Sequence, residues 1–223
     1  MITSETIDKD YPRVNQIILL LFCAYVVCWY LQIGYRIPFL GVIRFELVYA
    51  ILLSIIMVLS VGIPRFDNPL TMYLYLFLLC IIIQVPFSYD IKISWSVFID
   101  KIMKYAFMAL FIIAFVRSPK HLVLFIAAFM MACFKMGQEG LWKQISGGLV
   151  WQSQGIMRLH GSTPMYLHPN TLSGMALGTL PFIYYLYSIS KAWVKVVLVI
   201  MLIFAINIII FTGSRAGYLA FIT

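Results

Sequence analysis

Seven long apolar stretches, separated by polar segments, constrain the fold of this 223-residue chain more than any other feature. A helix needs about 20 mostly apolar residues to cross the roughly 30 Å hydrocarbon core of a bilayer. The stretches are apolar all round, whereas the strands of a membrane barrel alternate over about ten residues. They cover residues 15–33, 45–63, 70–87, 99–116, 121–135, 171–189 and 194–212. The sequence therefore predicts an all-α integral membrane protein, a polytopic helical bundle.

The composition also favours a bilayer over water as the surroundings of most side chains. Hydrophobic residues make up 63% of the chain and charged residues 11%, whereas a soluble domain is about half apolar and a quarter charged. The net charge is +8, but the basic residues lie singly at the ends of the stretches. Anchoring to anionic lipid explains this pattern better than a basic face for nucleic acid does. We expect membrane lipids, and no nucleic acid, as partners.

The last residues, 216–223, are typical of the first two turns of an eighth helix. A segment of this length cannot span a bilayer, and open carbonyls inside hydrocarbon would be costly. The pattern is that of an N-terminal fragment with seven complete spans and the start of an eighth, and we expect activity to need the missing part. We divide the chain into a five-span region, residues 1–135, and a second region, residues 136–223.

One predicted connection is far longer than the others. It covers residues 136–170, and long connections in compact proteins are usually functional or disordered. Residues 141–151 include two tryptophans and are expected to lie along the membrane interface. With the N-terminus inside, seven of the 16 basic residues face the cytoplasm, so the positive-inside rule does not decide the orientation. Two short basic turns, 117–120 and 191–195, favour this choice, which places the long connection outside.

The end of this connection concentrates polar groups directly before an apolar stretch. Its candidate functional residues are Arg158, His160, His168 and Asn170. Pro169 disfavours helical geometry at His168, and Asn170 is a natural N-cap for the helix that follows. Helix-start chemistry explains neither Arg158 nor His160. A metal site is not expected, because the two histidines lie eight residues apart with no third ligand at a recognised spacing.

A second polar motif, FTGSRAG over residues 211–217, connects the last complete stretch to the final segment. Gly213 suits a helix C-terminus and Ser214 an N-cap. Arg215 would then lie in the first turn of the next helix, where the helix dipole disfavours a cation by about 0.3–1 kcal/mol. Helix N-terminal N–H groups and a guanidinium both bind phosphate oxygens, so the motif indicates a phosphate site. The alternative is that Arg215 simply reaches lipid headgroups.

At these two motifs the sequence resembles the bacterial O-antigen ligase and O-antigen polymerase superfamily of polytopic membrane glycosyltransferases. That family commonly shows an arginine and a glycine before a Pro-Asn pair that opens a span, matched by Arg158, Gly161, Pro169 and Asn170. A Ser-Arg-Gly-like turn further on is matched by residues 214–217, with Ala216 where glycine is usual. The specific resemblance covers residues 154–223, and the preceding five stretches match only in hydropathy and number.

The resemblance implies transfer of a glycan from an undecaprenyl diphosphate donor to lipid A core, for a ligase, or to a growing glycan, for a polymerase. By the same resemblance, the reaction would take place at the periplasmic face of the bacterial inner membrane and would need no metal or other cofactor. Arg215 and Arg158 would stabilise the departing diphosphate. The residues expected to bind substrate are Ser214, His160, His168 and Asn170.

In that family a large loop further along the chain supplies more of the site, including the general base. Within these residues, His160 and His168 are the remaining candidates for a proton acceptor. Ligase, polymerase and protein-glycosylating relatives share the donor, so the sequence does not separate them. A transporter or flippase for an anionic lipid-linked substrate is the main alternative of another class, although such folds usually have broken helices near mid-membrane. A purely structural membrane subunit would leave Arg215 unexplained.

Overall fold

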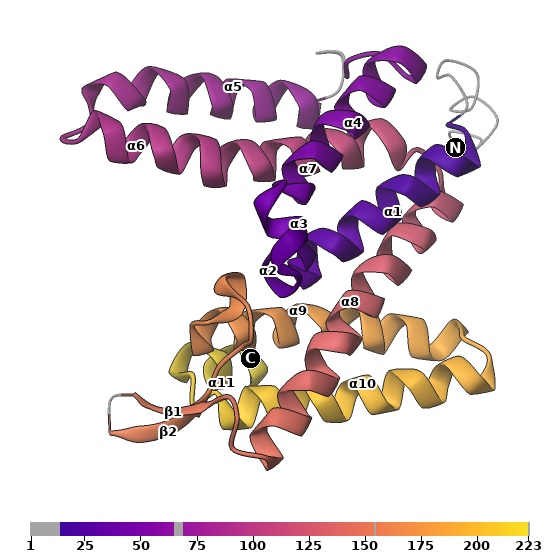
Figure 1. Ribbon diagram of the computed structural model, residues 1–223. Coiled ribbons are helices and arrows are strands. Elements are labelled where there is room, and N and C mark those ends of the chain that lie inside the picture. Colours follow the sequence, from indigo (N-terminus) through magenta and orange to yellow (C-terminus); the bar gives the residue numbers. More distant parts are fainter. Residues whose placement is uncertain (1–13, 65–68, 154, 223) are drawn as a thin grey trace. The chain divides into compact units, whose positions relative to one another are not determined.

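The computed structural model describes all residues except 1–13, 65–68, 154 and 223, and it is mostly helical (Figure 1). The helices are α1 (Gln16–Leu31), α2 (Ile33–Arg36), α3 (Pro38–Val42), α4 (Phe45–Ser60), α5 (Pro69–Gln84), α6 (Ile91–Val97), α7 (Met103–Phe115), α8 (Pro119–Ile145), α9 (Pro169–Ile189), α10 (Ala192–Phe211) and α11 (Arg215–Ile222). Shorter elements are the helical turns η1 (Val85–Phe87), η2 (Phe98–Ile102) and η3 (Pro164–Tyr166) and the strands β1 (Val150–Ser153) and β2 (Ile156–Leu159).

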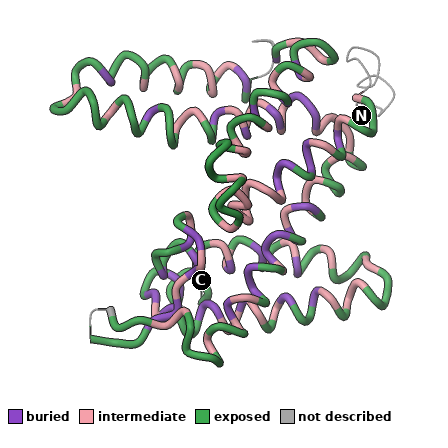
Figure 2. Tube along the Cα trace, in the orientation of Figure 1, coloured by how far each residue is buried: buried purple, intermediate pink, exposed green. Residues whose placement is uncertain are grey.

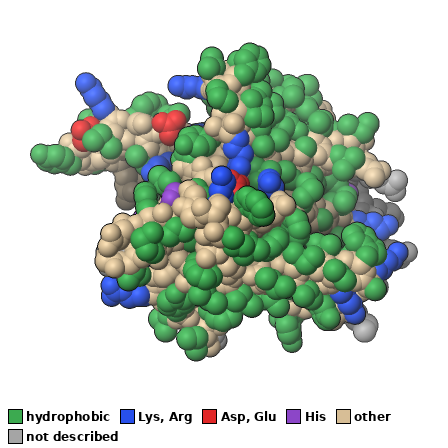
Figure 3. Space-filling model, turned by 60° about the horizontal axis from the view of Figure 1, so that its bottom comes forward, with side chains coloured by type: hydrophobic (Ala, Val, Ile, Leu, Met, Phe, Trp, Pro, Cys, Tyr) green, Lys and Arg blue, Asp and Glu red, His purple; other side chains and the backbone are tan. Residues whose placement is uncertain are grey.

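Four of the described helices are long and apolar enough to cross a membrane. They are α5 with its continuation η1, and α8, α9 and α10. By their length and composition these helices indicate a multi-pass membrane protein, as the sequence predicted. In the space-filling view, hydrophobic side chains are spread over much of the visible face, and Lys and Arg form small separate groups (Figure 3).

The other three predicted spans are also helical, but each lacks the length or the apolar character of a full span. The helices α1 and α4 have 16 residues each, and 16 residues reach only about 24 Å. The helix α1 ends where Gln32 takes a left-handed conformation, with φ at 50°. The third predicted span corresponds to α7, which has 13 residues and follows the π turn η2. Charged residues in α6, η2 and α7 lower the hydropathy there: Lys92, Asp100, Lys101 and Lys104.

The all-α prediction is wrong in the segment predicted as one long connection. The helix α8 continues past Lys135 to Ile145, and β1 and β2 then form an antiparallel hairpin that pairs Val150 with Leu159. The extension of α8 buries small residues on one face, including Gly137 and Gly140, although its charged residues lower the hydropathy of the sequence. The predicted interfacial segment, residues 141–151, therefore divides between α8, a turn and β1.

The described chain forms two compact units. Unit 1 comprises residues up to 25 and residues 47–125, and unit 2 comprises residues 26–46 and 126–223. The predicted boundary between residues 135 and 136 falls inside α8, within unit 2. As a division by function, that boundary stays a prediction.

Aromatic packing holds unit 1 together. Phe22 of α1 stacks on Phe125 of α8 with ring centroids 5.8 Å apart, and it also packs against Phe111 and Phe115 of α7. Phe22, Phe111 and Phe115 are fully buried. The Tyr49 hydroxyl of α4 donates to the Leu21 carbonyl oxygen at 2.8 Å, which satisfies a polar group inside this apolar unit.

Unit 2 is built on α9 and α10, which lie side by side and are joined by a short turn (Figure 1). Buried positions alternate with exposed ones along both helices, as expected where one helix face meets protein and the other meets lipid (Figure 2). Small residues let α8 approach α10 closely, since a Cβ added at Gly137 would lie 2.8 Å from the Cβ of Phe204. Such close contacts through small residues are typical of membrane helix packing.

Candidate functional site

Arg158 in β2 connects three elements of unit 2. Its side chain is only 6% exposed. The Nε atom donates to the Thr212 carbonyl oxygen at the end of α10, at 2.7 Å. The Nη2 atom donates to Asn170 Oδ1 in the first turn of α9, at 3.0 Å. The first polar motif therefore contacts the second across 54 residues of sequence.

The buried guanidinium of Arg158 has no carboxylate partner in the part of the chain that the structure describes. Both of its hydrogen-bond partners are neutral, and neither bond uses Nη1. Burying a charge without a counter-charge is costly. Glu139 is the last acidic residue of these 223 residues, and of the five basic residues that follow it only Lys143, four positions on in α8, has an acidic neighbour along the chain. This local charge imbalance favours an anionic ligand.

The turn between α10 and α11 has the predicted capping chemistry. Gly213 has φ at +56°, a left-handed conformation that costs glycine little. Ser214 is buried, and its Oγ accepts the Gly217 N–H at 3.1 Å, so Ser214 is the N-cap of α11. Both capping predictions are confirmed.

Arg215 begins α11, as predicted, and its side chain is exposed. Within the described residues it has no hydrogen-bond or ion-pair partner. A Cβ added at Gly213 would lie 3.7 Å from both Cγ and Nε of Arg158, so the arginine of the first motif lies against the turn that carries Arg215. The structure thus brings the two motifs together, with one guanidinium buried and the other open to a ligand.

Gly217 allows α11 to pack on α9. A Cβ at this position would overlap the Oγ of Ser173, a buried residue of α9. Ala216 is exposed by contrast. The packing therefore requires glycine at position 217, and it explains how alanine is accommodated at the neighbouring position, where the resembling family usually has glycine.

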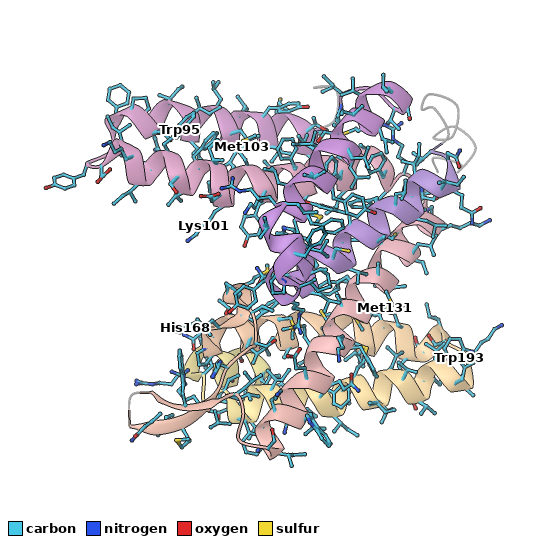
Figure 4. The ribbon with its side chains drawn as sticks, in the orientation of Figure 1. Trp95, Lys101, Met103, Met131, His168 and Trp193 are labelled. Atoms are coloured by element: carbon cyan, nitrogen blue, oxygen red, sulfur yellow. The ribbon has the colours of Figure 1, made fainter. Side chains whose placement is uncertain are left out.

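The start of α9 differs from the prediction in one residue role. His168 is the N-cap, with φ −81° and ψ 130°, and its Nδ1 accepts the Asn170 N–H at 3.2 Å (Figure 4). The extended geometry predicted for His168 before Pro169 is confirmed. The prediction of Asn170 as N-cap is wrong, because Pro169 has no N–H and occupies the first helical position, which moves the cap one residue before the proline. The Asn170 side chain accepts the hydrogen bond from Arg158 instead.

His160 lies half-buried after β2. Its Nδ1 is 2.9 Å from the Gly161 carbonyl oxygen, and its ring centroid lies 4.6 Å from that of Trp151. A carbonyl oxygen only accepts, so Nδ1 is the donor, and the neutral tautomer that fits this contact has its lone pair on Nε2. His168 has the opposite arrangement, because its Nδ1 lone pair caps α9. Of the two histidines, His160 is therefore the better suited to accept a proton.

Gly161 of the first motif has a packing role. Its N–H donates to the Tyr166 carbonyl oxygen at 2.8 Å, and a Cβ at this position would lie 2.6 Å from that same oxygen. No larger residue fits there without moving η3. The glycine thus folds the segment between the hairpin and α9 back on itself.

The sequence did not point to Arg36, which also contacts the segment between β2 and α9. Its Nη2 donates to Glu139 Oε2 at 2.8 Å and to Ser162 Oγ at 3.0 Å, and its Nε donates to the Leu31 carbonyl oxygen at 2.7 Å. Gln32 Oε1 accepts the Met165 N–H at 3.0 Å. A possible signal was Glu139, the one acidic residue after Asp100.

The described residues show no candidate metal site, and comparisons with known proteins give no family for the chain. Among the described residues, no three His, Cys, Asp or Glu side chains gather where they could hold a metal ion. No family model matches the chain, and no curated protein or solved structure matches it either.

Proposed function

We propose that this chain is part of a membrane glycosyltransferase of the O-antigen ligase-like superfamily. It would transfer a glycan from an undecaprenyl diphosphate donor to an acceptor hydroxyl. The observation that carries the proposal is the contact between buried Arg158, which has no carboxylate partner among the described residues, and the turn that carries exposed Arg215. A diphosphate is an anion of the size and charge that two guanidinium groups can bind.

The main catalytic requirement of this reaction is stabilisation of the negative charge that develops on the departing diphosphate. The acceptor oxygen forms a bond to the anomeric carbon of the donor sugar, while the bond from that carbon to the diphosphate oxygen breaks. The electron pair of the broken bond leaves with the diphosphate, and the acceptor proton passes to a base. Arg215 would bind the diphosphate oxygens bidentately as their charge grows, and Nη1 of Arg158 would add to the positive potential.

Two helix starts add to this potential. Arg158 is bonded to Asn170 at the start of α9 and lies against the turn before α11. Helix N-termini carry free N–H groups and a partial positive charge, and both favour phosphate. His168 and Ser214 would contribute to donor binding by ordering these two helix starts. His160, with its lone pair on Nε2, is the candidate proton acceptor within the described residues.

The proposed topology has seven spans in a bacterial inner membrane, with α11 following the seventh span and the site at the periplasmic face. The helices α1 and α4, with their flanking residues, and the run from α6 to α7 would provide the three further spans. Acceptors consistent with this placement are lipid A core, for a ligase, and a growing glycan, for a polymerase. An enzyme is favoured over a transporter because α9 and α10 each continue unbroken, α9 even through Pro181.

The test is transfer of a labelled glycan from undecaprenyl diphosphate by the purified full-length protein. Wild type, Arg215→Ala and the control Lys191→Ala are assayed with lipid A core and with a free glycan as acceptors. The proposal expects product with wild type and the control, and a loss of about 100-fold or more with Arg215→Ala. Product on lipid A core assigns a ligase, and a longer glycan assigns a polymerase. Donor that binds but is consumed with neither acceptor would favour the transporter and contradict the proposal.

A further inference from the structure

A pocket of about 510 Å³ lies on unit 2 and is lined by neither Arg158 nor Arg215. Residues of α8 form most of its lining, and α2 and α10 contribute one residue each. The α8 residues that share one face are Lys135, Gln138, Glu139, Trp142 and Ile145, at spacings of three and four. Ten residues of helix correspond to about 15 Å. The pocket is therefore an elongated one that follows the last turns of α8.

These turns lie at the polar end of a membrane span. The helix α8 has 27 residues, so it measures about 40 Å and exceeds the hydrocarbon core by about 10 Å. Its uncharged stretch covers residues 121–134, and charged residues begin at Lys135. Trp142 is 71% exposed, and tryptophan prefers the membrane interface. The pocket is therefore at the depth of the lipid headgroups.

The lining of the pocket has more positive than negative charges, which favours binding of an anion. Three basic residues line it, Arg36, Lys135 and Lys143, against the one carboxylate of Glu139. That carboxylate is paired with Arg36 at 2.8 Å. Lys135 donates only to the side-chain oxygen of Gln138, at 3.4 Å, and neither lysine has an ion-pair partner within the described residues. The helix dipole favours a cation in the last turn, such as Lys143, and Lys135 lies one turn before Glu139 and interacts electrostatically with it. Because Glu139 is already paired with Arg36, two of the three positive charges remain without a counter-charge of their own.

The remaining lining is apolar and suits a hydrocarbon chain. Leu141, Trp142 and Ile145 of α8 and Phe204 of α10 form it. Trp142 and Ile145 are each 71% exposed, so these walls remain accessible. A ligand that combines a phosphate with acyl chains satisfies both the lysines and the apolar walls.

We infer that this pocket binds an anionic membrane phospholipid, whose phosphate lies between Lys135 and Lys143 while its chains contact the apolar walls. The site is separate from the proposed glycosyltransferase site and does not depend on that function. A bound lipid would stabilise the contact between α8 and Arg36 of α2, which borders the same pocket.

The test is native mass spectrometry of the purified full-length protein with phosphatidylglycerol and, separately, phosphatidylcholine. Wild type is expected to retain phosphatidylglycerol in preference to phosphatidylcholine. The double variant Lys135→Gln/Lys143→Gln is expected to bind phosphatidylglycerol about tenfold more weakly or worse, since each lysine near an anionic lipid adds substantially to its attraction. The control Lys120→Gln/Lys191→Gln removes the same charge elsewhere and is expected to bind as wild type does.

A second variant, Trp142→Ala, leaves every charge in place and is expected to lower retention by about threefold to tenfold through lost contact with the chains. Three outcomes would overturn the inference: equal retention by the double variant and its control, no preference for phosphatidylglycerol in wild type, or displacement of the lipid by glycerol 3-phosphate. The last outcome would assign the pocket to a soluble phosphate.

Discussion

Arg36 and Arg158 both connect elements of unit 2, but only Arg36 has a carboxylate partner among the described residues. Arg36 has the carboxylate of Glu139 at 2.8 Å, with side chains 24% and 16% exposed. Arg158 is more deeply buried and is bonded only to a backbone carbonyl and a side-chain amide. A guanidinium that is neutralised inside the protein serves structure, whereas one without a counter-charge keeps its attraction for an anion. The comparison separates a structural arginine from a candidate binding arginine at the same end of one unit.

The largest expected effect is a difference in the rate of glycan transfer between the Arg215→Lys and Arg36→Lys variants. Both variants keep the charge and lose the planar fork. Arg215→Lys is expected to lower glycan transfer by about 100-fold or more, because bidentate binding of the diphosphate is lost. Arg36→Lys can still pair with Glu139 and is expected to lower transfer by less than about threefold. Initial rates of transfer by full-length protein measure both, and similar rates for the two variants would remove the distinction.

Arg158→Ala is expected to destabilise the protein more than Arg36→Ala does. It leaves the Thr212 carbonyl and the Asn170 amide without their buried donor, which costs about 2–4 kcal/mol of unfolding free energy. Arg36→Ala also loses hydrogen bonds, but water reaches its half-buried site, so about 1–3 kcal/mol is expected. Unfolding in mixed detergent micelles, followed by circular dichroism, compares the two. A larger loss of unfolding free energy for Arg36→Ala than for Arg158→Ala would mean that Arg36 contributes more to stability than Arg158, contrary to this prediction.

Removing the carboxylate tests whether Glu139 serves structure alone. Glu139→Ala leaves Arg36 without its counter-charge and is expected to lower the unfolding free energy by about 1–3 kcal/mol. Glu139→Gln keeps a hydrogen-bond acceptor and is expected to cost less. Transfer per folded molecule should be nearly unchanged in both variants. An activity loss in Glu139→Gln without a stability loss would place this carboxylate in the reaction.

The smallest effect is expected from Ser162→Ala, which removes one of the acceptors of Arg36. The remaining bonds to Leu31 and Glu139 hold the guanidinium, so a loss of about 0.5–1.5 kcal/mol is expected. The same detergent titration measures it, with wild type as reference. A loss as large as that of Arg36→Ala would mean that Ser162, rather than the ion pair, is the main contact.

Local chemistry was readable from the sequence, and contacts over long sequence separations were not. The cap at Ser214, the turn at Gly213 and the extended backbone before Pro169 each follow from a residue and its neighbours. The contact from Arg36 to Ser162 joins residues 126 apart, and no periodic pattern predicts it. The end of α8 was missed because its buried face consists of small residues, such as Gly137 and Gly140, among charged ones. The hairpin was missed because strands of four residues are too short to show an alternating pattern.

The central claim, that the contact of the two motifs creates an anion site, is tested most directly by binding of undecaprenyl diphosphate to the full-length protein in detergent. Equilibrium binding is measured for wild type, Arg215→Ala and Glu139→Gln. The account predicts that Arg215→Ala weakens binding by about tenfold or more, since bidentate Arg–phosphate contacts are strong, while Glu139→Gln binds as wild type does. Equal affinity of wild type and Arg215→Ala would contradict it and return Arg215 to a role in anchoring the helix to lipid headgroups.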